Sequence, residues 1–118
     1  MSRIRQSSPH MYGRHSSVVL GVMTEDKDDK FYERADAHIH LSNDQIGDVT
    51  SGKVSASMMY ATARFNAWLS ACGFSDAKAM QDLRDENIEY FVDQYRKMLI
   101  ENIDDYIDNF DSYMNTEW

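Results

Sequence analysis

The sequence predicts an all-α protein, folded as a compact bundle of three to four helices with a long C-terminal helix. Apolar residues recur at steps of three and four along several segments, which is the spacing of one face of an α-helix. No segment alternates apolar and polar residues in the manner of a half-buried strand. The 118 residues suffice for a single domain with a modest core.

The central helix is expected over Lys53–Cys72, which carries the heaviest apolar load in the chain. Its apolar stripe has the period of a buried helix face, and neither Gly nor Pro interrupts it. Gly73 follows directly, where a glycine can adopt the left-handed conformation that ends many helices. The stripe consists of Val54, Met58, Ala61, Phe65, Trp68 and Cys72.

A first helix is expected from about Asp28 to Gln45. Acidic residues at its start suit the positive end of the helix dipole, and Gly47 follows its end. Residues 48–52 then form a loop. The apolar side of this helix is formed by Phe31, Ala35, Ile39 and Ile46.

The C-terminal region contains no Gly or Pro over residues 76–114. A single helix of that length would measure about 57 Å at 1.5 Å per residue, which is long for a small domain. The charged cluster at residues 82–86 therefore predicts a break. We expect a short helix near residues 76–83, with Ser75 as its N-cap, and a long helix over about residues 85–111.

Three segments are expected along the chain. Residues 1–27 form a disordered basic tail and a polar approach to the first helix, because the first 22 are rich in Arg and Ser and contain no acid. Residues 28–114 form the helical bundle domain, and residues 115–118 form a C-terminal tail.

The chain is acidic, with a formal net charge of -8. Such a surface repels nucleic acid and anionic membranes, so neither is expected as a partner. Basic proteins and cations are the more natural ligands. The single cysteine, Cys72, excludes an intramolecular disulfide, and no apolar run is long enough to span a bilayer. We expect a cytoplasmic protein.

Three blocks carry a resemblance to a known family: FYERADAHIHLSNDQ (31–45), GKVSASMMYATARFNAWLSA (52–71) and YFVDQYRKMLIENIDDYIDNF (90–110). In this order they resemble a small bacterial protein family that is catalogued only as a domain of unknown function. The resemblance covers about residues 28–112. It implies a compact helical fold of bacterial origin, and it supplies no activity, cofactor or catalytic residue.

One candidate metal site lies on the first helix. Asp36, His40 and Asp44 are four residues apart, with Glu33 one turn earlier, so all four share a helix face. Carboxylate and imidazole groups can bind a divalent metal. Helical-bundle metal sites, however, draw ligands from several helices. A solvated polar face is the alternative, and no cofactor is expected.

Arg64 is the only charged residue inside the central helix, one turn after Tyr60. Packing of this helix between acidic ones predicts an ion pair between Arg64 and Asp36, which would be costly to break. An anion-binding arginine is the alternative. His38, beside the apolar stripe of the first helix, is either a hydrogen-bonded boundary residue or a pH-sensitive group.

The last helix carries an acidic surface opposite its apolar side. It has no basic residue after Lys97. The acids either keep the protein soluble or bind a basic partner. They are Glu101, Asp104, Asp105, Asp108 and Asp111.

The end of the chain has more apolar residues than one narrow stripe can bury. An exposed apolar patch usually marks an interface, and a two-fold dimer is the commonest assembly. We therefore expect a homodimer in which the last helices pair antiparallel. This arrangement brings Arg96 and Lys97 of one chain towards the acids of the other. The interface residues are Tyr106, Phe110, Tyr113 and Met114, with Trp118 beyond them.

Two classes of function follow. The first is a non-enzymatic protein-interaction module that uses its acidic surface or a helix face. The second is a helical protein that binds a divalent metal or a small ligand, and that could be an enzyme. The sequence has no repeated carboxylate–histidine motif, which favours the first class. No nucleophile with an oriented base is evident either, so acid–base catalysis has no positive support.

Overall fold

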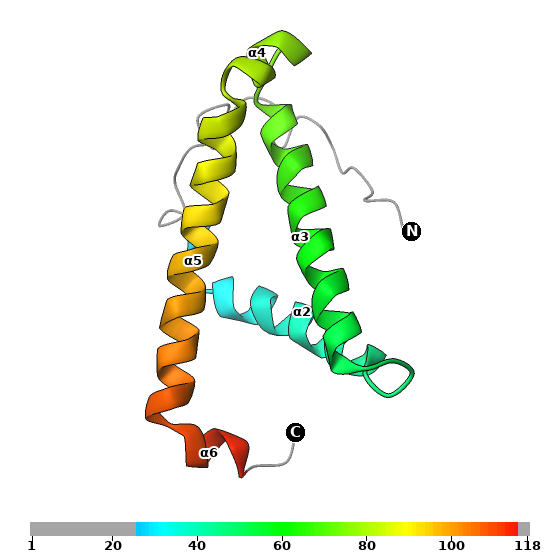
Figure 1. The fold of residues 1–118 in the computed structure, drawn as a ribbon, viewed down its shortest axis with the longest axis vertical. Coiled ribbons are helices and arrows are strands. Elements are labelled where there is room, and N and C mark those ends of the chain that lie inside the picture. The colour runs from blue at the N-terminus through cyan, green and yellow to red at the C-terminus, as the bar shows by residue number, and fades with distance from the viewer. Residues whose placement is uncertain (1–25, 116–118) are drawn as a thin grey trace. The chain divides into compact units, whose positions relative to one another are not determined.

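The computed structural model describes residues 26–115, and within them it contains helices and no strand. The tail expected before residue 26 and the last three residues, including Trp118, lie outside this range. Within residues 26–115 five helices follow one another, so the all-α class and the long C-terminal helix are confirmed (Figure 1). They are α2 (Phe31–Gln45), α3 (Ser51–Cys72), α4 (Ala77–Asp82), α5 (Arg84–Asp108) and α6 (Phe110–Met114).

The chain divides into two units between Leu83 and Arg84. The first unit contains α2, α3 and α4, and the second contains α5 and α6. This boundary falls within the charged cluster at residues 82–86, where the sequence predicts a break.

Helix α2 starts three residues later than the sequence suggested. Asp28 belongs to a turn, in which its carbonyl accepts a hydrogen bond from the Phe31 N–H at 3.1 Å. Its carboxylate accepts two bonds from the Arg34 guanidinium, at 2.7 and 3.3 Å. This bridge lowers the pKa of Asp28, chiefly through the hydrogen bond from Arg34. Asp28 therefore anchors the first turn of α2 from outside the helix.

The connection from α2 to α3 is a tight loop that depends on two local features. Gly47 has a φ of 119°, a conformation that L-residues with a side chain rarely adopt. Thr50 then caps α3, because its Oγ1 accepts a hydrogen bond from the Lys53 N–H at 3.3 Å. The cap places the start of α3 two residues before the predicted one. Figure 1 shows α2 crossing the N-terminal end of α3 beyond this loop.

The ends of α3 and α5 and the start of α4 lie close to the predicted positions but differ in detail. Gly73 ends α3 as predicted, but with a φ of -87°, so it is not left-handed. Asp76, rather than Ser75, caps α4, and its Oδ1 accepts a hydrogen bond from the Ala79 N–H at 2.8 Å. The long helix ends at Asp108, three residues early, because Asn109 interrupts it.

Burial is much lower than the apolar stripes predict. Val54, with 4% of its surface exposed, is the one buried apolar residue among residues 26–115. Trp68 and Cys72 of the same stripe are half-buried, whereas Met58 and Phe65 are exposed. The helical period is confirmed, but the expectation that the whole stripe is buried is wrong for Met58 and Phe65.

Candidate functional site

An open groove of about 690 Å³ lies between α2 and α3, inside the first unit. Residues spaced by three and four put one face of each helix on its walls. No Asp or Glu lines this groove, although the chain has 20 acidic residues. Its walls include His38, Leu41 and Gln45 from α2, and Val54, Met58 and Arg64 from α3.

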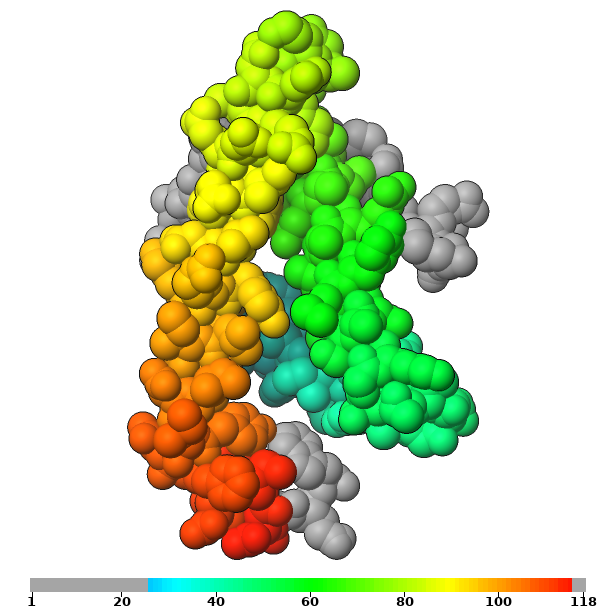
Figure 2. Space-filling view, viewed as in Figure 1, coloured from blue at the N-terminus to red at the C-terminus, as the bar shows by residue number. Residues whose placement is uncertain are grey.

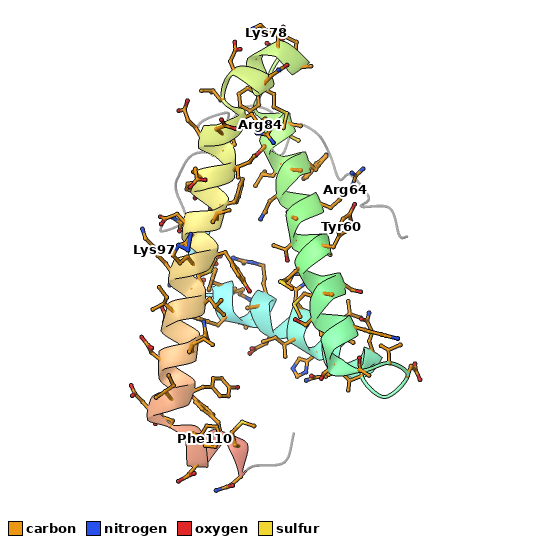
Figure 3. The ribbon with its side chains drawn as sticks, viewed as in Figure 1. Tyr60, Arg64, Lys78, Arg84, Lys97 and Phe110 are labelled. Atoms are coloured by element: carbon orange, nitrogen blue, oxygen red, sulfur yellow. The ribbon has the colours of Figure 1, made fainter. Side chains whose placement is uncertain are left out.

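Arg64 is exposed on the wall of this groove. Figure 3 shows that Tyr60 and Arg64 project from the same side of α3. Arg34, Lys78, Arg84 and Lys97 each pair with a nearby acid of residues 26–115, whereas no ion pair described there includes Arg64. Within residues 26–115, the guanidinium of Arg64 is thus exposed and has no acidic partner.

The expected ion pair between Arg64 and Asp36 is not formed. Asp36 is exposed and is not part of the groove wall. It precedes His38 by two residues, and residues two apart point to different sides of a helix. Because His38 faces the groove, Asp36 points away from it.

The Arg64→Ala variant is expected to unfold within about 0.5 kcal/mol of the wild type, as exposed substitutions usually do. Urea unfolding followed by circular dichroism measures this difference. The matched control is Arg34→Ala, which removes the bridge to Asp28 at the start of α2. A loss of several kcal/mol in Arg64→Ala would show instead that the guanidinium has a buried partner.

The candidate metal ligands Asp36, His40 and Asp44 are all exposed on α2. Among residues 26–115, no group of three or more His, Cys, Asp or Glu side chains is placed to hold a metal ion. Positions four residues apart lie about 6 Å apart along one helix, so a single helix cannot make three such groups converge on one ion. The exposure of all three side chains is what the polar-face alternative expects, and the metal site stays a prediction.

The second unit has its own candidate site, at the junction of α5 and α6. The Asp105 carboxylate accepts a hydrogen bond from Asn109 Nδ2 at 3.0 Å and another from the Tyr113 hydroxyl at 2.7 Å. The bond to Asp105 raises the pKa of Tyr113 above its ordinary value. The stability that this bond contributes is fully present below the ordinary tyrosine pKa. It is lost as the pH rises through the raised pKa of Tyr113. Asp105 thus links the last turn of α5 to Asn109 and to Tyr113 of α6.

This junction presents a continuous apolar area, which we call the C-terminal apolar surface. Figure 2 shows α6, in red, beside the last turns of α5, in orange. Tyr106 and Tyr113 are half-buried, with ring centroids 4.5 Å apart. Phe110, labelled in Figure 3, is 58% exposed. The surface consists of Ile103, Tyr106, Ile107, Phe110, Tyr113 and Met114.

The predicted acidic residues border this surface, and all five are exposed: Glu101, Asp104, Asp105, Asp108 and Asp111. The sequence did not reveal that Asp105 has a structural role. Nor did it reveal the groove, because Leu41 and Gln45 lie outside the predicted stripe of α2. The spacing of His38, Leu41 and Gln45 was the signal that could have indicated a second face.

These features define a small all-helical protein with a groove in one unit and an apolar surface in the other. The chain belongs to the family described as "Protein of unknown function (DUF3144)", whose model matches residues 31–107. The predicted resemblance to a family of unknown function is confirmed. Within residues 26–115, no helix is both long and apolar enough to cross a membrane.

A solved structure supports the fold. The chain is similar to the protein NB7890A from Shewanella sp, determined by NMR, with 40% sequence identity and a TM-score of 0.62. The match covers 79% of this chain and 99% of the Shewanella chain. No curated protein matches the sequence.

Proposed function

We propose that this chain is a small bacterial, cytoplasmic protein-interaction module without enzymatic activity. Residues 28–114 form its helical domain, and the C-terminal apolar surface is its binding site. The identity to the Shewanella protein supports the bacterial origin. The half-buried single thiol of Cys72 is compatible with a reducing compartment.

The exposure of the C-terminal apolar surface is the observation that carries the proposal. Ile103, Ile107 and Met114 have 51%, 66% and 51% of their surface exposed, close to the value for Phe110. Contiguous apolar side chains of this size are costly to leave in water and usually mark an interface. The hydrogen bonds at Asp105 hold α6 in place, so the surface is ordered before a partner binds.

The partner proposed first is a second copy of the chain. A two-fold homodimer covers the apolar surfaces of both copies at once. The acids around the surface make a basic protein the second candidate, since opposite charges accelerate and orient association. No cofactor enters this proposal.

The Phe110→Glu variant tests the proposal. We expect the wild-type chain to dimerise at micromolar concentrations and the variant to be monomeric, because a carboxylate would have to be buried in the interface. Light scattering over a range of concentrations measures the molar mass in solution.

The matched control is Tyr32→Glu, which changes an aromatic residue on α2 that is 62% exposed and lies outside the surface. It should dimerise like the wild type. Two outcomes would contradict self-association through this surface. The wild-type chain could stay monomeric at every concentration, or the Phe110→Glu variant could dimerise normally.

A further inference from the structure

We infer that the groove between α2 and α3 receives the end of helix α5 from a second copy of the chain, over residues Leu99–Asp108. This inference rests on the proposed function, because it names what the α5 part of the C-terminal apolar surface, around Ile103 and Ile107, binds in a second copy. It assigns a role to the groove and to Arg64. The observations behind it are the shape of the groove, its charge and the pairing of the basic residues.

The groove has the form of a helix-binding site. Two helices offer one face each, and an amphipathic helix is bound in such a groove through apolar residues at helical spacing. The wall on α3 extends from Val54 to Arg64, which is about 15 Å at 1.5 Å per residue.

The end of α5 matches this groove in length and pattern. Leu99, Ile103 and Ile107 lie one turn apart, and their exposed fractions are 44%, 51% and 66%. They extend over about 12 Å of helix, which is within the length of the α3 wall. One helix of a second copy could therefore place three apolar side chains against the apolar residues of the groove.

The charges of the two surfaces are complementary. The groove has Arg64 on its wall and no carboxylate. The end of α5 has Asp104 and Asp108 beside its apolar residues and no basic residue after Lys97. A helix docked in the groove would bring at least one of these carboxylates towards the guanidinium of Arg64, which can bind a carboxylate through two hydrogen bonds.

Antiparallel pairing of two α5 helices is less favourable on charge. It relies on the basic residues of α5 to neutralise the acids of the other copy. Lys97, however, already pairs with Asp93 of its own helix, with Nζ and Oδ2 3.2 Å apart. Arg96 has no ion pair within residues 26–115, and it alone would then face the five acids of the other copy's stripe. The groove adds a second such guanidinium, that of Arg64, and has no carboxylate on its wall.

Reciprocal docking closes the assembly. Each copy inserts its α5 into the groove of the other, so that the same contact occurs twice about a two-fold axis. Both grooves are then occupied, and Leu99, Ile103 and Ile107 of both copies are covered.

Two charge-reversed chains test this arrangement. The first carries Arg64→Glu in the groove, and the second carries Asp104→Arg with Asp108→Arg on α5. All three residues are exposed, so both chains should fold, which circular dichroism checks. Each chain alone places like charges together at both contacts. We expect the dissociation constant of its dimer to rise by about tenfold or more.

Mixing the two chains is the decisive step. In a mixed dimer, one contact joins the glutamate introduced in the groove of the first chain to the two arginines introduced on α5 of the second. The other contact is native. The mixture should therefore dimerise with a constant within about threefold of the wild type, since opposite charges meet at both contacts. Native mass spectrometry identifies the mixed dimer. The control is Lys53→Glu, the same change of charge on α3 outside the groove, which should not affect dimerisation.

Three results would overturn the inference. If Phe110→Glu abolishes the dimer while both charge-reversed chains dimerise normally, the C-terminal surface is an interface but the groove is not its receptor. If each charge-reversed chain dimerises more weakly and mixing the two chains does not restore dimerisation, the groove and the end of α5 do not meet between copies. If the wild type is monomeric throughout, the inference and the proposed self-association fail together.

Discussion

The Val54→Asp variant is expected to lose about 3 kcal/mol or more of unfolding free energy, because it buries a carboxylate in an apolar site without a partner. Val54 is 4% exposed, and it lies one turn into α3 at the wall of the groove. No other apolar residue among residues 26–115 is as deeply buried. Urea unfolding followed by circular dichroism gives the difference, as a lower midpoint of the transition that involves α2 and α3.

The control is Val49→Asp, which makes the same substitution five residues earlier in the loop. Val49 is 43% exposed, so its replacement should change the unfolding free energy by no more than about 0.5 kcal/mol. Equal losses in the two variants would show that Val54 is not the anchor of this packing.

The Gly47→Ala variant is expected to lose about 1–3 kcal/mol, which is the usual cost of a strained backbone conformation. The φ of 119° at Gly47 requires a residue without a Cβ, although the space around it is open. The strain therefore comes from the backbone itself and not from a clash. Thermal unfolding of the variant beside the wild type measures the loss.

The Gly52→Ala variant should instead gain unfolding free energy. Gly52 lies in the first turn of α3, has ordinary backbone geometry and has no atom within 4 Å of an added Cβ. Alanine in this position restricts the unfolded chain and favours the helix, by about 0.5 kcal/mol. If both alanine variants shift stability in the same direction, the loop does not depend on the special conformation of Gly47.

Helix type and order could be predicted from sequence, because they follow from periodicity and from local caps. The end of α3 was placed correctly, since Gly73 follows an uninterrupted apolar stripe. The start of α2 was wrong by three residues, because the bridge from Arg34 to Asp28 lies outside the helical pattern. The break at Asn109 was missed for a similar reason. At this break the Asn109 side chain donates a hydrogen bond to the Asp105 carboxylate, a contact that no apolar pattern reveals.

The candidate sites were less predictable, because they depend on how helices face one another. A stripe indicates which residues share a face, but not whether another element covers that face. Met58 and Phe65 therefore have the predicted spacing and are still exposed. The predicted pairing of Arg64 with Asp36 rests only on the acidic charge of the neighbouring helix. The actual crossing of α2 and α3 turns His38 towards the groove that Arg64 lines and leaves Asp36 on the other side.

The hydrogen bonds at Asp105 make one position of the acidic stripe unlike the other four. Glu101, Asp104, Asp108 and Asp111 contribute charge, and a carboxylate could move among neighbouring exposed positions without altering the backbone. The carboxylate at 105 also accepts bonds from Asn109, where α5 gives way to α6, and from Tyr113 of α6. Moving this acid to another position would keep the composition and the net charge of the chain but would remove both bonds.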